Sequence, residues 1–149
     1  MSKVRNILQK KGNKTFSISP NDTVYNGLEL MVENNLGALL VVDNGHFTGI
    51  FTERDYARKV VLRGKASRET LVKEIMSEHP ATVSLDTTIE DCMKIMTSNN
   101  TSTSGTIRHL PVLESGELVG LVSMGDLVRF IIDEQRIIIE DLEHYISGR

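Results

Sequence analysis

Two short segments place a hydroxyl residue three positions before an aspartate, where an apolar stretch ends. The first pair is Thr52 with Asp55, and the second is Ser123 with Asp126. A carboxylate can accept hydrogen bonds from both hydroxyl groups of a ribose, and a hydroxyl residue can join helix N-terminal N–H groups around a phosphate. The same spacing also makes a capping box, which needs no ligand. Both interpretations place each pair where a strand is followed by a helix.

Arg108 and His109 form a second candidate for anion binding. They precede the apolar residues 110–113, so we expect them at the beginning of a strand. Arginine can hold a phosphate through two parallel hydrogen bonds, and histidine adds a donor whose charge depends on pH. The alternative is a pair of solvated charges at a strand edge.

These segments belong to an internal duplication. At a spacing of 65 residues the matching pairs are Ser17 with Thr82, Ile18 with Val83, Thr23 with Thr88 and Met31 with Met96. At a spacing of 71 residues they are Gly45 with Gly116, Gly49 with Gly120, Thr52 with Ser123 and Asp55 with Asp126. The change in spacing indicates an insertion at residues 101–106, which is either a lid over one cleft or an ordinary mobile loop. A doubled supersecondary unit builds paired crevices, and crevices are where ligands bind.

Hydrophobic periodicity gives each copy the order strand, helix, strand, turn, strand, helix. Asp22 is expected to cap a helix with Val24 and Met31 on its apolar face, and Asn44-Gly45 predicts a hairpin turn. The other expected elements of the first copy are strands at residues 16–19, 39–42 and 47–51, and a helix from Thr52 to about Gly64. Those of the second copy are strands at residues 82–83, 110–113 and 118–122, a helix around Ile89, Cys92, Met93 and Met96, and a closing helix from Ser123 to about Ile146.

Composition narrows the possible classes of protein. The 149 residues suit one compact domain or a pseudo-dimer of two small halves, and the net charge of −3 argues against nucleic-acid binding. Cys92 is the single cysteine, which excludes an internal disulfide, and we expect it to be buried. The histidines have no i, i+4 pair, so a metal site is not expected. No apolar run approaches the ~20 residues of a membrane span, and residues 1–14 lack the apolar core of a secretory signal, so we expect a cytoplasmic protein.

The duplicated unit resembles a tandem pair of CBS domains, a Bateman module. The resemblance rests on the repeated pattern of glycine, two apolar residues, threonine or serine, two residues and aspartate, and it covers almost the whole chain. Residues 52–59 and 107–112 are also typical of small stand-alone members. The resemblance implies an α+β fold of two β-α-β-β-α repeats packed as a pseudo-two-fold pair. The first repeat would span residues 1–64 with an N-terminal helix, and the second residues 65–149 with a long C-terminal helix.

The resemblance also implies a ligand class. Clefts between the repeats of this family bind adenosine-containing molecules, so AMP or another adenosine phosphate (ADP, ATP or NAD) is implied, with S-adenosylmethionine less favoured. Each aspartate would hold the ribose, and each hydroxyl residue would approach the phosphate. The further residues implied to line the clefts are Arg54, Phe16, Ile18, Gly37, Ala38, Ile50, Ala81, Val83 and Leu121.

The two clefts are not expected to be equivalent. Because each cleft in the family draws on both repeats, the Arg108-His109 pair is expected to face Thr52 and Asp55 rather than the equivalent residues of the second copy. The first-copy equivalents of the pair are Gly37 and Ala38, which carry no charge. The other cleft would therefore depend on backbone groups and on other cations, for which the candidates are Arg129, Lys11 and Lys14.

These observations favour a non-enzymatic regulatory module, an energy or redox sensor that acts on an unknown partner protein in trans. The ligand would shift the population between two placements of the repeats. The alternative is a structural or interaction module with vestigial clefts, against which the retention of Arg108 counts. An enzyme would need a general base or metal ligands beside the phosphates, and the sequence has no paired acids, Walker-type loop or plausible nucleophile.

The closing helix carries an apolar stripe that one small repeat cannot easily cover. Its members are Val128, Ile131, Ile138, Leu142, Tyr145 and Ile146. With charged residues on its other faces, the helix is amphipathic. It either packs along its own repeat or pairs with a second subunit, and we expect a homodimer.

Overall fold

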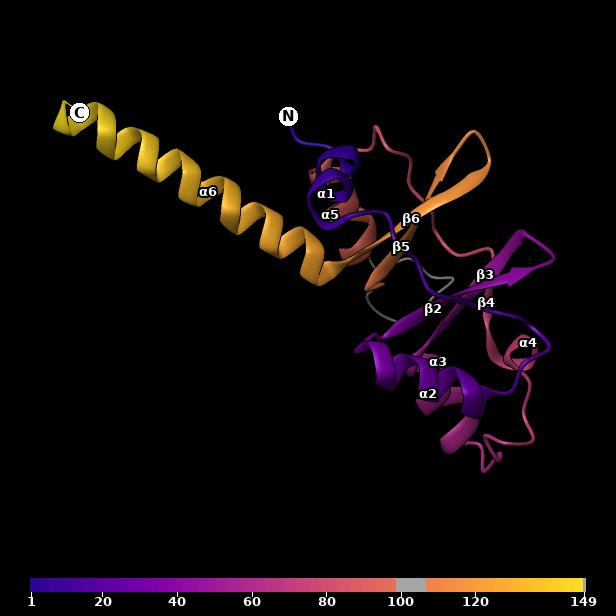
Figure 1. Ribbon diagram of the computed structural model, residues 1–149. Helices are drawn as coiled ribbons and strands as arrows, with labels where there is room; N and C mark the ends of the chain where they lie inside the picture. Colours follow the sequence, from indigo (N-terminus) through magenta and orange to yellow (C-terminus); the bar gives the residue numbers. More distant parts are fainter. Residues whose placement is uncertain (99–106, 149) are drawn as a thin grey trace.

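The computed structural model describes residues 1–98 and 107–148, and the insertion predicted at residues 101–106 lies outside them. Two α/β halves lie side by side, and the last helix projects away from both (Figure 1). In chain order the elements are α1 (Val4–Lys11), β1 (Ser17–Ile18), α2 (Val24–Asn34), β2 (Ala38–Asp43), β3 (His46–Thr52), α3 (Glu53–Tyr56), the π-helical turn η1 (Ala57–Val61), α4 (Val72–Ile75), β4 (Ser77–Glu78), α5 (Ile89–Thr97), β5 (His109–Glu114), β6 (Glu117–Ser123) and α6 (Met124–Ser147).

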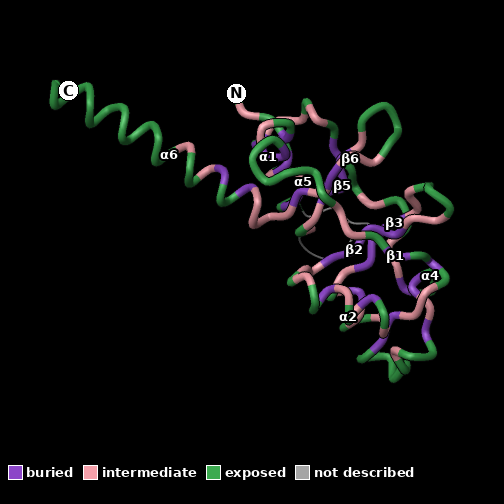
Figure 2. Tube along the Cα trace, viewed as in Figure 1, coloured by how far each residue is buried: buried purple, intermediate pink, exposed green. Residues whose placement is uncertain are grey.

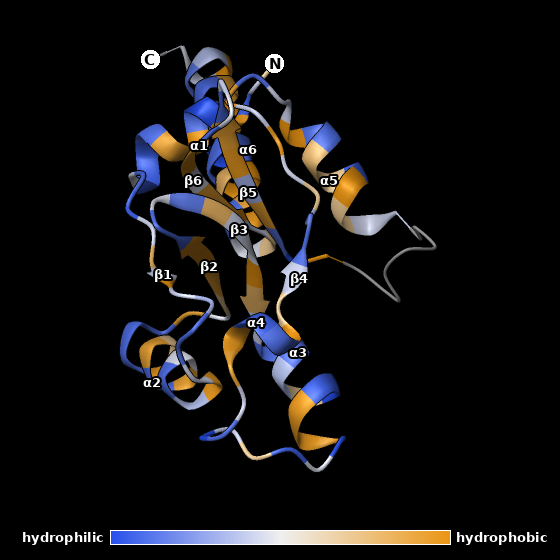
Figure 3. Ribbon diagram, turned by 90° about the vertical axis from the view of Figure 1, so that its right-hand side faces the viewer, coloured by the Kyte–Doolittle hydropathy of each residue, from blue (hydrophilic) through white to orange (hydrophobic). Residues whose placement is uncertain are grey.

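Each half is built around an antiparallel hairpin. The β2–β3 hairpin turns at Asn44 and Gly45, both with positive φ, as the sequence predicts. In the first half, β1 pairs in parallel with β2 and β4 pairs with the outer edge of β3, giving the order β1-β2-β3-β4. The β5–β6 hairpin forms a two-stranded sheet of its own. Figure 3 shows the apolar strands β2 and β5 in the middle of the molecule.

The strand predicted at residues 82–83 is reduced to a single bridge. Val83 lies parallel to Val112, and its N–H and C=O groups bond to Pro111 and Leu113 at 3.0 and 2.9 Å. Two ladder bonds are too few for a named strand. The residue nevertheless occupies the place that Ile18 of β1 occupies beside β2.

The helix starts follow local capping rules, with one correction. Thr23, not Asp22, is the N-cap of α2, because the Thr23 hydroxyl accepts from the Asn26 N–H at 3.1 Å. Asp22 instead accepts from the Thr23 N–H at 2.8 Å. Thr88 caps α5 in the same way, by accepting from the Asp91 N–H at 3.1 Å. Each helix therefore begins one residue after a threonine in extended conformation.

The two halves exchange the short helices that precede them in sequence. Although α1 was expected to belong with the first repeat, its Val4, Ile7 and Leu8 are buried in the second core. In return, Val72 and Ile75 of α4 are buried in the first core. Matching backbone bonds tie the exchange at both ends. They are Val4 N–H to Thr87 C=O and Ile89 N–H to Ser2 C=O in one half, and Val72 N–H to Asp22 C=O and Val24 N–H to Thr70 C=O in the other.

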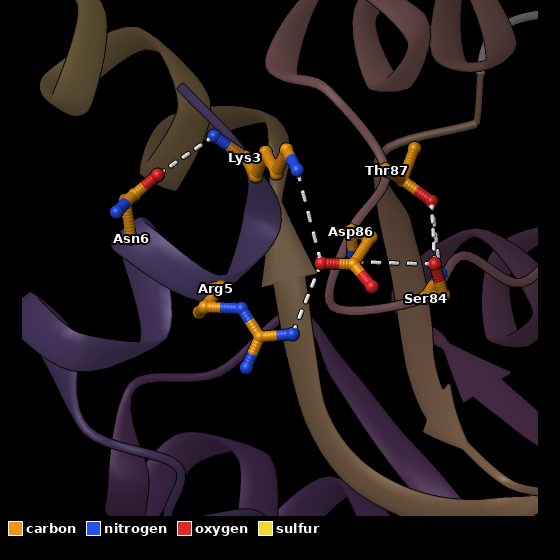
Figure 4. A network of polar contacts seen from close by, with 6 residues as sticks. All are labelled: Lys3, Arg5, Asn6, Ser84, Asp86 and Thr87. Carbon is orange, nitrogen blue, oxygen red and sulfur yellow. Dashed lines mark hydrogen bonds and ion pairs between the residues drawn. The ribbon is translucent and has the colours of Figure 1, made fainter. Parts of the chain in front are cut away.

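Surface charges add to the attachment of α1 to the second half. Arg5 Nη2 lies 3.0 Å and Lys3 Nζ 3.9 Å from Asp86 Oδ1, in a loop held by Ser84 and Thr87 (Figure 4). The hydrogen bond and charge of Arg5 lower the pKa of Asp86. Exposed pairs of this kind contribute little to stability. The buried face of α1 therefore carries most of the attachment.

The interior of the second half extends into the first turns of α6 and no further. Leu127 and Phe130 are buried, and Ile131 packs partly against the same core, whereas the helix is exposed from Gln135 onward (Figure 2). Cys92 is fully buried as expected, and burial raises the pKa of its thiol to about 11. At neutral pH this cysteine is therefore a small apolar core residue.

Candidate functional site

Asp55 lies in the first turn of α3 and forms a capping box with Thr52. Its Oδ2 atom accepts hydrogen bonds from the Thr52 N–H and hydroxyl groups, both at 3.0 Å, and its own N–H donates to Thr52 Oγ1 at 3.1 Å. Lys59 Nζ lies 3.1 Å from Asp55 Oδ1, and the Ser77 hydroxyl donates to the same oxygen at 3.4 Å. The buried carboxylate is thus satisfied from within the protein.

Asp126 occupies the equivalent place in the first turn of α6. Its Oδ2 atom accepts from the Ser123 N–H at 2.8 Å, and its N–H donates to Ser123 Oγ at 3.1 Å. Two cations approach the carboxylate: Lys11 Nζ at 2.7 Å from Oδ2 and Arg129 Nη2 at 2.9 Å from Oδ1. Burial would raise the pKa of Asp126, but the hydrogen bonds from Lys11 and Ser123 hold it below its ordinary value. The group is ionised at neutral pH.

In both halves a lysine ammonium bridges the aspartate and a backbone carbonyl. Lys59 also donates to the Ile75 C=O at 3.0 Å, and Lys11 to the Leu121 C=O at 2.8 Å. Lys11 and Arg129, two of the cations predicted for the second cleft, both lie beside Asp126. Lys59 was not predicted, although its i, i+4 spacing from Asp55 is a recognisable signal.

Lys14, Ser77 and Arg54 lie in different surroundings. Lys14, the third candidate cation, lies 5.1 Å from the centre of the Phe16 ring. Ser77 reaches Asp55 from β4, across 22 residues of sequence, and no local pattern marks it. Arg54, in the first turn of α3, is half-buried.

The backbone places Arg108 and His109 beside Ser123, and the expectation that their side chains face Thr52 and Asp55 stays a prediction. The Arg108 C=O accepts from the Met124 N–H at 2.8 Å, and His109 is paired with Ser123 in the β5–β6 register. The reason is that a hairpin returns its first strand to the end of its second. Gly37 and Ala38 sit correspondingly beside Thr52 in the first half, where the Gly37 C=O accepts from the Glu53 N–H at 3.1 Å.

The His109 ring nevertheless reaches the first half. A Cβ atom built on Gly37 would lie 3.5 Å from His109 Cε1 and 3.7 Å from Glu53 Oε1. Burial lowers the pKa of His109; the charge of Asp126 opposes this, and the charges of Lys11 and Arg108 add to it. His109 is therefore neutral at pH 7 and lies at the junction of the two halves.

The glycines of the repeated motif serve close packing of the exchanged segments. A Cβ atom on Gly49 would lie 2.5 Å from the Ser77 carbonyl oxygen of β4. One on Gly120 would lie 2.9 Å from Leu8 Cδ1 of α1. Both glycines thus admit the segment that the other repeat supplies.

The remaining predicted residues differ in burial. Ile18, Ala38, Ile50 and Val83 are buried, Phe16, Gly37 and Leu121 are half-buried, and Ala81 is exposed. The Leu121 backbone, rather than its side chain, makes the contact with Lys11. Of these residues, Ile18 lines a hollow of about 410 Å³ with Asp22, Asn26, Glu29 and Glu33. A second hollow of about 650 Å³ lies between Phe47, Met76 and His79 and contains neither aspartate pair.

Residues 1–98 and 107–148 offer neither a metal site nor a membrane-spanning helix. This part of the chain contains no group of three or more histidine, cysteine, aspartate or glutamate side chains that could hold a metal ion. No helix within it has the length and apolar character needed to cross a membrane.

Comparisons with known proteins agree on the family. The model of the CBS domain matches twice, at residues 4–62 and 72–133. The structure of a putative signal-transduction protein with CBS domains from Burkholderia ambifaria is 44% identical, with a TM-score of 0.83, and the match covers 90% of this chain and 96% of that one. The CBS domain-containing protein CBSX3, mitochondrial, of Arabidopsis thaliana is 40% identical over 132 residues. That match covers 85% of this chain but only 61% of the relative. Because the name of this relative places it in mitochondria, the cytoplasmic location of the present chain stays a prediction.

Two more distant structures share the fold and hold ligands. CBSX2 in complex with AMP is 22% identical, with a TM-score of 0.69, and the match covers 91% of this chain and 99% of that one. The CBS domain pair of protein MJ0100, in complex with 5′-methylthioadenosine and S-adenosyl-L-methionine, is also 22% identical, with a TM-score of 0.74 and coverage of 90% and 98%. At this identity the likeness concerns the fold alone.

Proposed function

The chain belongs to the CBS-domain family, and from this premise we propose that it is a non-catalytic regulatory module that binds an adenosine phosphate beside Asp55 and Asp126. The observation that carries the proposal is the repeated placement of a buried carboxylate at a helix N-terminus with a lysine beside it. A carboxylate suits a ribose diol, and the N–H groups and lysine suit a phosphate. The adenosine ligands named for the distant structural neighbours support this class.

Binding can be tested with a panel of AMP, ADP, ATP, NAD and S-adenosylmethionine in thermal unfolding. A ligand at one hundred times its Kd should stabilise the fold by about 2.7 kcal/mol. Calorimetry on Asp55→Ala and Asp126→Ala then assigns the sites, because each variant should lose one binding event. Unchanged melting with every ligand at millimolar concentration would contradict the proposal.

One observation favours the alternative of an interaction module with vestigial clefts. Both carboxylates have their hydrogen-bond acceptors largely occupied by groups of the protein. On this alternative the aspartates serve only as caps. Ligand binding by the intact protein, abolished at one site by each aspartate variant, separates the two functions.

We also propose that the output passes in trans through a homodimer in which α6 pairs with its copy. Ile138 and Leu142 are about half exposed, and Tyr145 and Ile146 are more than 80% exposed. Monomers rarely tolerate an apolar patch of this size.

A further inference from the structure

The carboxylate of Asp126 is held by a lysine that comes from the opposite end of the chain. Lys11 is the last residue of α1 and lies 115 residues from Asp126 in sequence, and its ammonium group contacts both Asp126 Oδ2 and the Leu121 C=O. Ile7 and Leu8, on the preceding turn, are buried in the second core and fix the position of this end of α1. The lysine side chain itself remains about one-third exposed, so it can turn toward an incoming group.

The hydrogen bonds at Asp126 leave too little acceptor capacity for a ribose diol. A carboxylate has about four acceptor positions. The Ser123 N–H and Lys11 take both positions on Oδ2, and Arg129 takes one on Oδ1. The Ser123 N–H belongs to the capping box and stays in place, so a diol that binds one hydroxyl group to each carboxylate oxygen must displace Lys11 from Oδ2.

We propose that Lys11 makes the Asp126 site selective for phosphorylated ligands. When the ribose diol binds to Asp126, the Lys11 ammonium group leaves the carboxylate and pairs with the ligand phosphate instead. This inference rests on the proposed function and names a specificity-determining residue within it. A nucleoside without phosphate displaces the ammonium group and offers no anion in return. A nucleoside phosphate offers one, so its binding keeps the lysine paired.

Lys11 is the better candidate for this exchange than Arg129. Arg129 bonds to Oδ1, which keeps a second acceptor position for the diol, so Arg129 does not have to leave when the diol binds. Lys11 is less exposed, and its charge lies between the carboxylate and the β6 backbone, where an uncompensated ammonium group is more costly.

The test compares AMP with adenosine by calorimetry on the full chain. The wild type should bind AMP more tightly than adenosine at the site that Asp126→Asn removes. Lys11→Met should reduce this preference by about tenfold or more, since a hydrogen bond to a charged group is lost with AMP and a competitor is removed with adenosine. Lys11→Arg should retain the preference. Lys10→Met is the matched control, because Lys10 precedes Lys11 on α1 but lies over the ring of Phe130 on α6 instead of bonding to Asp126.

The outcomes distinguish this inference from the proposed function. If the wild type binds AMP and Lys11→Met keeps the full preference, Lys11 does not determine specificity, and the proposed function stands. If the wild type binds neither AMP nor adenosine at the Asp126 site, this inference is wrong, whereas the proposed function is decided by the other ligands of the panel. Should Lys11→Met fail to fold, Lys11→Gln keeps a hydrogen-bond donor without the charge and should show the same reduced preference.

Discussion

Lys59 forms an ion pair with Asp55 from four residues further along the chain, whereas the equivalent position after Asp126 is occupied by Phe130. Phe130 is buried in the second core. The second aspartate obtains its lysine from α1 instead, at 2.7 Å. Two copies of one motif thus reach the same pairing of carboxylate and ammonium through different elements, and we expect them to respond differently to mutation.

Asp55→Ala should destabilise the fold more than Asp126→Ala. Asp55 is only 7% exposed, and its loss leaves the Thr52 N–H and Lys59 without their acceptor, at a cost of about 1–3 kcal/mol. Lys59 and Lys11 are similarly exposed, at 40% and 34%, so the lysines contribute little to the difference. Asp55 also accepts from the Thr52 and Ser77 hydroxyl groups, whereas the second cation at Asp126, Arg129, is 71% exposed, so water can replace its carboxylate partner for about 1 kcal/mol. Urea unfolding at pH 7 measures the difference. Equal losses would contradict this account of the two carboxylates.

Gly49→Ala should be more damaging than Gly120→Ala. The added methyl group at Gly49 meets the Ser77 carbonyl oxygen at 2.5 Å, and the backbone of β4 can relieve the clash only by leaving β3. At Gly120 it meets the end of the Leu8 side chain at 2.9 Å, which can change rotamer. We expect a loss of about 1–3 kcal/mol for Gly49→Ala and less for Gly120→Ala in the same urea experiment. The reverse order would contradict this account of the two glycines.

The features that local rules determine could be predicted from the sequence. The hairpin turn at Asn44 and Gly45 depends on two adjacent residues, and the helix starts after Thr52 and Ser123 depend on a spacing of three. The choice between Asp22 and Thr23 as N-cap could not be made, because both side chains can cap a helix. The final choice depends on the backbone conformation of each residue.

The features that depend on distant pairing could not be predicted. The exchange of α1 and α4 between the halves leaves no local signature, and Lys11 reaches Asp126 only as its result. The place of His109 depends on local and distant pairing together. The hairpin register sets its backbone beside Ser123, and only the packing of the two halves brings its ring near Gly37.

His109 should make stability fall as the pH is lowered through the ordinary histidine pKa of 6.5 and below it. Its pKa in the fold lies below the ordinary value of 6.5, so on acidification the unfolded chain takes up the proton first, and stability falls as pH falls through this window. The Asp126 carboxylate, whose pKa is also lowered, loses its contribution only at more acidic pH. Urea unfolding across the window should show a flatter curve for His109→Gln than for the wild type. Two curves of equal slope would assign the dependence to other groups.

Removal of the distal part of α6 should convert a dimer into a monomer. Truncation after Asp133 deletes Ile138, Leu142, Tyr145 and Ile146, each of which contributes about 1.5–3 kcal/mol when buried in an interface, and symmetry counts each contact twice. Light scattering should give a dimer for the intact chain and a monomer for the truncated one. A monomeric intact chain rules out the homodimer, whereas dimers of both lengths rule out only the role of α6.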